Sequence, residues 1–316
     1  MAGVQGCIGL VSALQRVLLS GEAAITAEVM PPRGGDPSHA LAMAELLRGR
    51  VHAINVTDGS RAVMRMSSLA LCRLLLDAGH EPVLQMACRD RNRIALQGDL
   101  LGAHALGIRN LLCLTGDPVK AGDQPGARPV NELESVRLLQ QVTAFNSGLD
   151  PVRETLADGP TSLFAGAAAD PHASSWSGLS RRLERKRKAG AQFVQTQMVM
   201  DAAVLERFCR ELAAPMELPV LAGVFLLKSA RNAQFINRMV PGACIPEALI
   251  ERLASAENPA AEGVAIAAEQ VRRYLGIAQG VHLMAVKAEE RIPEILRLAG
   301  VSSQAVNSQA VNSQQS

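Results

Sequence analysis

The segment Ala24-Ile25-Thr26-Ala27-Glu28-Val29-Met30-Pro31-Pro32 joins an apolar run to an acid and then to two prolines. Such a run is typical of a buried strand that ends at the prolines and delivers the Glu28 carboxyl to a site. Burial would raise the pKa of Glu28 and favour its protonated form near neutral pH. A carboxyl group in that state can act as a general acid. The alternative is a carboxylate in a solvated loop or in a structural ion pair.

Similar apolar runs recur along the chain and alternate with longer helical patterns. The predicted strands cover residues 23–29, 51–57, 82–87, 109–115, 162–168, 192–199, 218–225 and 280–286. The predicted helices cover residues 37–48, 66–79, 92–106, 131–145, 176–189, 201–213, 229–239, 246–256, 260–276 and 290–299. Eight β-then-α units predict an α/β fold, a single-domain (β/α)8 TIM barrel. A doubly wound open sheet is the second choice, but no G-x-G-x-x-G follows the first strand.

Two segments lie outside the predicted units. Residues 7–19 have helical spacing and predict an N-terminal helix. We therefore expect one domain over residues 1–300, followed by a tail over 301–316. The tail repeats Ser-Gln-Ala-Val-Asn without any charge, which predicts disorder.

Composition excludes several classes of protein. The net charge of +2 and an aromatic content of 3% argue against a nucleic-acid binder, which needs a basic surface and stacking platforms. No run approaches the roughly 18 apolar residues that span a membrane. The six cysteines show no C-x-x-C pairing and the chain starts without a signal-peptide pattern, so we expect a reduced, cytoplasmic protein. The histidines lack metal-ligand spacing, so we expect no metal site.

Polar residues lie on or directly after several of the predicted strands, near the ends that share one face of a TIM barrel. They are Glu28, Thr57, Asp58, Gln85, Arg89, Asp90, Arg91, Asn92, Thr115, Gly116, Asp117, His172, Gln195 and Gln197. Their convergence predicts a binding site at this rim. Each has a plainer interpretation: turns at residues 57–59 and 115–117, an ion-pair cluster at 89–91, and two amides that satisfy each other. The basic run that contains Lys186 is either a solvated helix face or a phosphate contact.

The residues at these strand ends resemble those of the methylenetetrahydrofolate reductase family, especially a bacterial and archaeal branch that includes acetogen enzymes. The resemblance covers nearly the whole chain. It is carried, in order on successive predicted strands, by residues 28–32, 55–58, 88–92, 114–117, 189–197 and 221–224. The family is built on a flavin-dependent TIM barrel. It reduces 5,10-methylenetetrahydrofolate to 5-methyltetrahydrofolate with hydride from NADH or NADPH.

The resemblance implies roles for individual residues. Glu28 matches the acid that protonates folate N10, and Asp117 matches an aspartate that binds folate and favours the cationic intermediate. Gln197, with Gln195 beside it, matches the pterin contact. The remaining matches imply an FAD site. Its residues are Thr57, Asp58, Gln85, Arg89, Asp90, Arg91, Asn92, Thr115, Gly116, Asp117, Ala168, His172 and Lys186.

Four positions depart from the family pattern. Gln85 replaces a usual histidine, Ala168 a tyrosine, Leu179 an aspartate and Ala230 an aromatic residue. The cofactor is therefore left open between FAD, FMN and no flavin. Two alternatives follow: a flavin-independent reductase of the same substrate, or a folate- or flavin-binding subunit that is active only within a complex. We expect a homo-oligomer, and the acetogen branch also suggests a second subunit.

Overall fold

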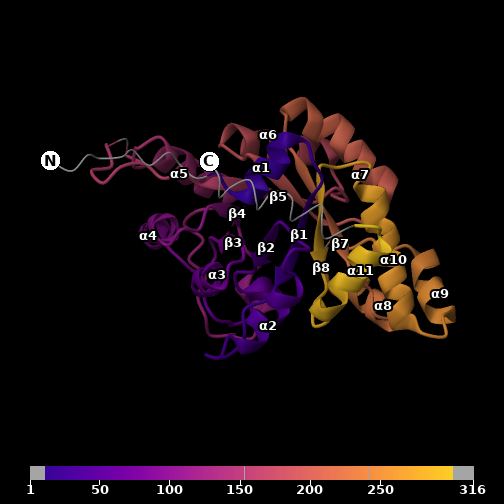
Figure 1. Ribbon diagram of the computed structural model, residues 1–316. Helices are drawn as coiled ribbons and strands as arrows, with labels where there is room; N and C mark the ends of the chain where they lie inside the picture. Colours follow the sequence, from indigo (N-terminus) through magenta and orange to yellow (C-terminus); the bar gives the residue numbers. More distant parts are fainter. Residues whose placement is uncertain (1–10, 153, 241, 302–316) are drawn as a thin grey trace.

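Eight parallel strands close into a barrel in chain order, which confirms the predicted (β/α)8 architecture (Figure 1). The computed structural model describes residues 11–152, 154–240 and 242–301. The strands are β1 Ala24–Val29, β2 Ala53–Val56, β3 Pro82–Ala87, β4 Asn110–Leu114, β5 Phe164–Ala169, β6 Phe193–Met198, β7 Val220–Phe225 and β8 Gly280–Met284. The barrel closes where β1 pairs with β8, with Thr26 opposite His282.

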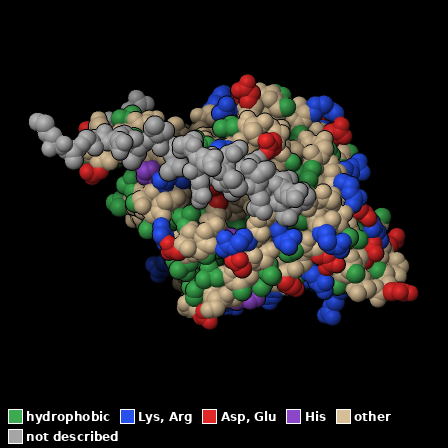
Figure 2. Space-filling model, in the orientation of Figure 1, with side chains coloured by type: hydrophobic (Ala, Val, Ile, Leu, Met, Phe, Trp, Pro, Cys, Tyr) green, Lys and Arg blue, Asp and Glu red, His purple; other side chains and the backbone are tan. Residues whose placement is uncertain are grey.

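Helices surround the strands (Figure 1). They are α1 Ala13–Ser20, α2 Ser38–Leu46, α3 Ser68–Asp77, α4 Arg93–Ala105, α5 Ser135–Asn146, α6 Trp176–Lys188, α7 Ala202–Phe208, α8 Ala230–Met239, α9 Glu247–Ser255, α10 Pro259–Tyr274 and α11 Ile292–Leu298. In the described part of the chain, no helix is both long enough and apolar enough to cross a bilayer. Acidic and basic side chains are interspersed over the visible face (Figure 2).

The alternation of side chains along β1 decides which residues point into the barrel. Ile25, Ala27 and Val29 pack in the layer between the strands and the helices. Ala24 belongs instead to a separate cluster inside the barrel. Glu28 shares the face of Ala24, because it lies four residues further along the strand. Its carboxyl group is therefore directed into the barrel at the carboxyl end of the strand.

Helix α1 closes the amino end of the barrel. Leu14 and Val17 are buried against Phe164 and Phe193, whose rings stack at a centroid distance of 5.0 Å. The backbone amides of Ala13 and Leu14 donate to the Glu81 carboxylate at 2.7 and 2.8 Å. A carboxylate at a helix amino terminus satisfies amides that have no partner inside the helix and complements the helix dipole.

Several boundaries differ from the predicted ones. The predicted helix 131–145 begins at Ser135, because Asn131 has a φ of 44° and Glu134 accepts a bond from the Val136 amide as the cap. The predicted helix 201–213 ends as an α-helix at Phe208 and continues as a π-helical turn, Cys209–Ala213. Residues 7–10 of the predicted helix 7–19 lie outside the described residues, and the helix itself begins at Ala13, after the cap Ser12, and runs to Ser20. The tail prediction for 302–316 lies outside the described residues.

Candidate active site

Glu28 lies at the mouth of the barrel with a partly buried side chain. Its carboxyl group makes no hydrogen bond within the described residues. Burial is the main cause that raises the pKa of Glu28 from 4.5 to about 7, and the charge of Glu289 adds to the rise. Arg65 acts in the opposite direction and lowers this pKa. The protonated form of Glu28 therefore persists to a much higher pH than that of an ordinary glutamate.

Polar groups without partners lie beside and beneath Glu28. Asn55, its register partner on β2, donates from Nδ2 to Gln195 Oε1 at 2.6 Å across the barrel. Its other amide atom, Oδ1, is buried and has no partner, and the same is true of Thr57 Oγ1 and His282 Nε2. Burial lowers the pKa of His282 to about 3, so its ring is neutral. Buried polar atoms without partners carry a large desolvation cost, which a hydrogen bond to a ligand or to water would offset.

Two charged residues beside Glu28 were missed by the sequence reasoning. Arg65, in the loop after β2, donates from Nη1 to the Pro31 carbonyl at 2.8 Å. Its Nε atom is buried without a partner. Glu289 begins the 3₁₀ turn Glu289–Arg291 after β8 and is only 8% exposed. Glu289 follows a predicted strand end, so its position was the one signal that could have found it.

Asp117 lies on the same rim, in the loop after β4, and is exposed. Its Oδ2 accepts a hydrogen bond from the Arg61 amide at 2.7 Å. Arg61 and Ala62 have φ values of 57° and 54°, a left-handed conformation that is costly for residues other than glycine. The structure thus holds Asp117 against the loop after β2, and no hydrogen bond or ion pair within the described residues joins it to Glu28.

The predicted cluster after β3 is largely engaged in ion pairs. Arg91 pairs with both Asp58 and Asp99, and its Nη2 also donates to the Ala87 carbonyl at 3.0 Å. Arg89 is buried and binds the neighbouring Asp90 carboxylate through two nitrogens, at 2.8 and 2.6 Å. These contacts match the plainer interpretation, an ion-pair cluster around the start of α4.

Asn92 is the amino-terminal cap of α4. Its Oδ1 accepts a bond from the Ala95 amide at 2.9 Å. Side chains of this kind satisfy one of the free amides in the first turn of a helix. This contact accounts for the position of Asn92 without a ligand.

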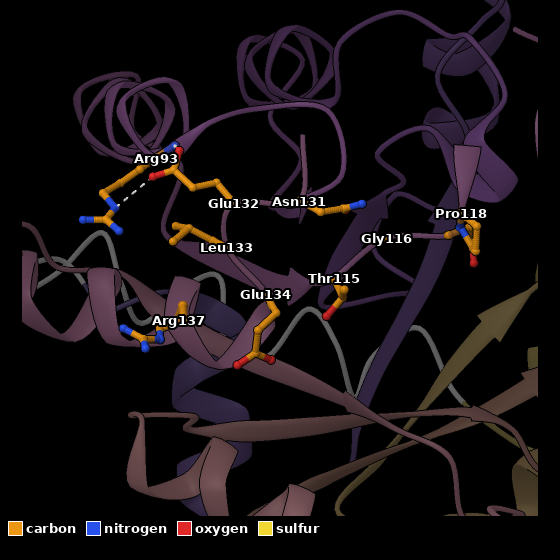
Figure 3. A pocket seen from close by; sticks show the side chains of 10 residues that line it. Arg93, Thr115, Gly116, Pro118, Asn131, Glu132, Leu133, Glu134 and Arg137 are labelled. Carbon is orange, nitrogen blue, oxygen red and sulfur yellow. Dashed lines mark hydrogen bonds and ion pairs between the residues drawn. The ribbon is translucent and has the colours of Figure 1, made fainter. Parts of the chain in front are cut away.

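Thr115 and Gly116 line a cavity of about 530 Å³ at the outer edge of the rim (Figure 3). The cavity extends past Asn131 to the start of α5, where Glu134 and Arg137 line it. Its mixed charges include an Arg93–Glu132 ion pair, drawn in Figure 3. A space of this size and polarity can hold part of an extended polar ligand.

Lys186 reaches from α6 to the end of β5. Its Nζ donates to the Ala168 carbonyl at 2.6 Å, and burial lowers its pKa. Lys186, Arg182, Ala168 and Leu179 line a small cavity of about 100 Å³. Nearby, the His172 amide donates to Asp170 Oδ1 at 2.9 Å, whereas His172 Nε2 is buried without a partner.

A ligand that carries phosphates and a polar ring edge fits these groups. Its ring edge could bond to Thr57 Oγ1 and His172 Nε2, and its phosphates could face the cations of the small cavity, Arg182 and Lys186. A flavin nucleotide is such a ligand. Ala168 and Leu179 offer it only apolar contact. The donor set therefore fits the phosphate and polar parts of a flavin better than it fits tight stacking of the ring.

The three glutamines differ in their surroundings. Gln85 and Gln195 are each 7% exposed, and Gln195 is bound to Asn55 inside the barrel. Gln197 is half-buried within an irregularity of the β6–β7 pairing, and its Oε1 accepts a bond from the Met198 amide at 2.9 Å. The Gln197 Nε2 group makes no hydrogen bond to any described residue, so it is free to donate to a ligand. In the described part of the chain, no group of three or more His, Cys, Asp or Glu side chains could hold a metal ion.

The family model described as methylenetetrahydrofolate reductase matches residues 13–300. The chain belongs to the methylenetetrahydrofolate reductase family. The chain is 25% identical over 309 residues to a probable methylenetetrahydrofolate reductase (NADPH) of Caenorhabditis elegans, with 91% of this chain and 44% of that protein covered. It is also 25% identical over 272 residues to methylenetetrahydrofolate reductase 2 of Schizosaccharomyces pombe, with 78% and 40% covered. The chain thus spans less than half the length of these relatives.

A solved structure shares the fold of the reductase-family chain. It is an uncharacterized protein from Clostridium thermocellum that binds two copies of 5-methyl-5,6,7,8-tetrahydrofolic acid. The TM-score is 0.62 at 12% identity, with 92% of this chain and all of the other covered. At this identity the likeness shows the fold alone.

Proposed function

We propose that the protein reduces 5,10-methylenetetrahydrofolate to 5-methyltetrahydrofolate, with hydride from NADH or NADPH and with Glu28 as the general acid. The observation that carries the proposal is the Glu28 carboxyl itself. It points into the mouth of a family-matched barrel, it makes no hydrogen bond, and its pKa is raised to about 7. A group with these properties holds a proton at neutral pH and can release it.

Glu28 supplies the proton that opens the methylene bridge of the substrate. The bridge joins N5 and N10, and cleavage of its bond to N10 leaves a cationic iminium at N5. Protonation of N10 makes this nitrogen a better leaving group, so an acid whose pKa is raised to about 7 is suited to the step. After donation Glu28 is a carboxylate, which stabilises the adjacent cation electrostatically.

Asp117 and Gln197 are proposed to hold the substrate at the rim. The exposed Asp117 carboxylate is fixed by the Arg61 amide, which leaves its other oxygen, Oδ1, to accept a bond from the pterin. Its negative charge also favours the iminium cation. The free amide nitrogen of Gln197 can donate to a pterin acceptor.

A flavin, with FAD as the first candidate and FMN as the second, would be held by Thr57, His172 and Lys186. When bound, such a cofactor would supply the chemistry of hydride transfer between the nicotinamide and the folate. Thr57 Oγ1 and His172 Nε2 would gain the partners that they lack in the protein alone. Arg182 and Lys186 would face its phosphates.

The second candidate is a reductase of the same substrate that works without a flavin. The apolar lining contributed by Ala168 and Leu179 beside Lys186 favours it, because neither side chain can hydrogen-bond a cofactor. The ion pairs that occupy Arg89 and Arg91 favour it as well, since both guanidinium groups already have carboxylate partners.

Two measurements on the freshly purified chain test the proposal. The first is oxidation of NADH or NADPH that depends on 5,10-methylenetetrahydrofolate, with 5-methyltetrahydrofolate identified as the product. The second is a visible spectrum, in which the absorbance of oxidised flavin favours the flavin route over the direct one. Absence of turnover by the chain alone, with turnover restored by a second subunit, would replace the proposal by a subunit that acts only in a complex.

A further inference from the structure

Two oppositely charged residues come from the segments that follow the two neighbours of β1, the strand of Glu28. β1 pairs with β2 on one side and with β8 on the other. Arg65 comes from the loop after β2, and Glu289 comes from the turn after β8. We propose that Arg65 and Glu289 are positioning residues for Glu28, the first favouring its carboxylate and the second its carboxylic acid. The importance of these opposite effects for catalysis rests on the proposed function, whereas the effects on the protonation of Glu28 do not depend on it.

Arg65 is fixed above the end of β1 by a single backbone contact. Its Nη1 donates to the carbonyl of Pro31, three residues after Glu28, at 2.8 Å. Its Nε is buried and has no hydrogen-bond partner, and no carboxylate forms an ion pair with it within the described residues. Arg65 is half-buried, and a guanidinium group that is partly withdrawn from water without a paired anion loses hydration and gains little in return. Its charge is therefore available to a carboxylate that forms nearby.

Glu289 supplies the opposite charge from a buried position. Only 8% of it is exposed, and it makes no ion pair within the described residues. The turn that it begins also packs against α2, the helix that follows β1. The neighbouring Glu290 is exposed. Two acidic groups in one poorly solvated region resist ionising together, so a charge on Glu289 holds the proton on Glu28.

The other polar groups around Glu28 are uncharged, paired or exposed, so they add no strong charge effect to those of Arg65 and Glu289. On β2, Asn55 and Thr57 are uncharged, and the following Asp58 is paired with Arg91. On β8, His282 is neutral because burial lowers its pKa to about 3. On the outer elements, Lys287 and the α2 residue His39 are exposed.

Burial is the main cause of the raised pKa of Glu28, and the charges of Glu289 and Arg65 adjust that pKa in opposite directions. Glu289 raises it further and Arg65 limits the rise, with a result of about 7. An acid with a much higher pKa would hold its proton too firmly to donate it. One with its usual pKa would be deprotonated at pH 7. A catalytic pKa near the working pH gives the best compromise.

The test is a direct titration of the Glu28 carboxyl group. Protein labelled with ¹³C at the glutamate carboxyl carbon is followed by NMR as a function of pH, and the Glu28 signal is assigned by its absence in Glu28→Gln. The variants are Arg65→Met, which keeps the length of the side chain, and Glu289→Gln, which keeps its shape. Arg65→Lys, which retains the charge, and Glu290→Gln, on the exposed neighbour, are the matched controls. Circular dichroism confirms the fold of each variant, and Arg65→Gln replaces Arg65→Met if the latter does not fold.

The expected midpoint moves upward in Arg65→Met and downward in Glu289→Gln, each by about half a pH unit or more, and it stays in place in both controls. The pH profile of kcat should move in the same two directions. An unchanged midpoint in both variants, or shifts of the same sign, would overturn the inference. Opposite shifts in a protein whose Glu28→Gln variant still reduces folate at the wild-type rate would sink the proposed function and leave the inference standing.

Discussion

The two ends of the barrel differ in how far their buried polar groups are hydrogen-bonded. At the amino end, Ser12 donates to Asn110, Asn110 donates to Glu81, and Glu81 caps helix α1. Every side chain in this chain of contacts has a partner, and apolar side chains fill the space above it. At the carboxyl end, buried polar atoms of Thr57 and Arg65 have none.

This difference suggests that the amino end of the barrel contributes to stability and the carboxyl end to ligand binding and catalysis. A closed network of satisfied groups lowers the free energy of the folded state and has no capacity left for a ligand. A rim with unpaired donors and an acid of raised pKa costs stability, and it retains the capacity to bind and to transfer a proton. Substitutions at the floor should therefore change stability alone, whereas substitutions at the mouth should change function and can even raise stability.

Leu14→Ala should show the largest effect on stability. Leu14 is fully buried where α1 meets the barrel floor, so truncation should lower the free energy of unfolding by about 3 kcal/mol. Denaturant unfolding gives the value, and kcat of the folded protein should not change. Leu19→Ala on the same helix is the control, because Leu19 is 67% exposed. If Leu14→Ala lost kcat under conditions in which it is fully folded, the claim that this end of the barrel affects stability alone would be wrong.

Glu28→Gln should become more stable than the wild type as the pH rises. The pKa of Glu28 is raised in the folded state, so the unfolded state loses this proton first and the wild type loses stability between pH 4.5 and about 7. Glutamine does not ionise. The variant should therefore gain on the order of 2 kcal/mol relative to the wild type between about pH 5 and about pH 8.5. Urea unfolding at the two pH values measures the difference, and a difference that does not depend on pH would refute the raised pKa.

Thr57→Val should give the smallest effect, with opposite signs for stability and binding. The hydroxyl is buried without a partner, and valine has nearly the same shape. Removal of the unsatisfied group should stabilise the protein without ligand by about 1 kcal/mol. The variant should bind added FAD or FMN more weakly, as measured by the quenching of flavin fluorescence. Equal flavin affinity in both proteins would remove Thr57 from the cofactor site.

The sequence predicted the barrel and the level of Glu28, because apolar runs between helical patterns are a property of neighbouring residues. The same local logic placed Thr57, Asp117 and Gln197 at strand ends. It could not show that Gln195 bonds to Asn55 across the barrel, since that contact joins residues 140 positions apart. Nor could it decide whether Arg91 would bind a cofactor or Asp58, because both choices suit the same residue types.

Arg65 and Glu289 escaped prediction for a related reason. Neither belongs to a motif, and only the closed barrel brings β2 and β8, the strands that precede them, to the two sides of β1. The start of α5 escaped because a left-handed Asn131 delays the helix, and a pattern of apolar residues does not report backbone conformation.

The role of Glu28 as the general acid is tested most directly by single-turnover reduction of 5,10-methylenetetrahydrofolate by Glu28→Gln. NADH or NADPH oxidation by an artificial electron acceptor is measured in parallel. The variant keeps the shape of the side chain and loses its proton. We expect folate reduction to fall by about two orders of magnitude or more. Any flavin-supported oxidation of NADH or NADPH by the artificial acceptor should be retained. Folate reduction by Glu28→Gln at the wild-type rate would contradict the assignment of Glu28 as the acid.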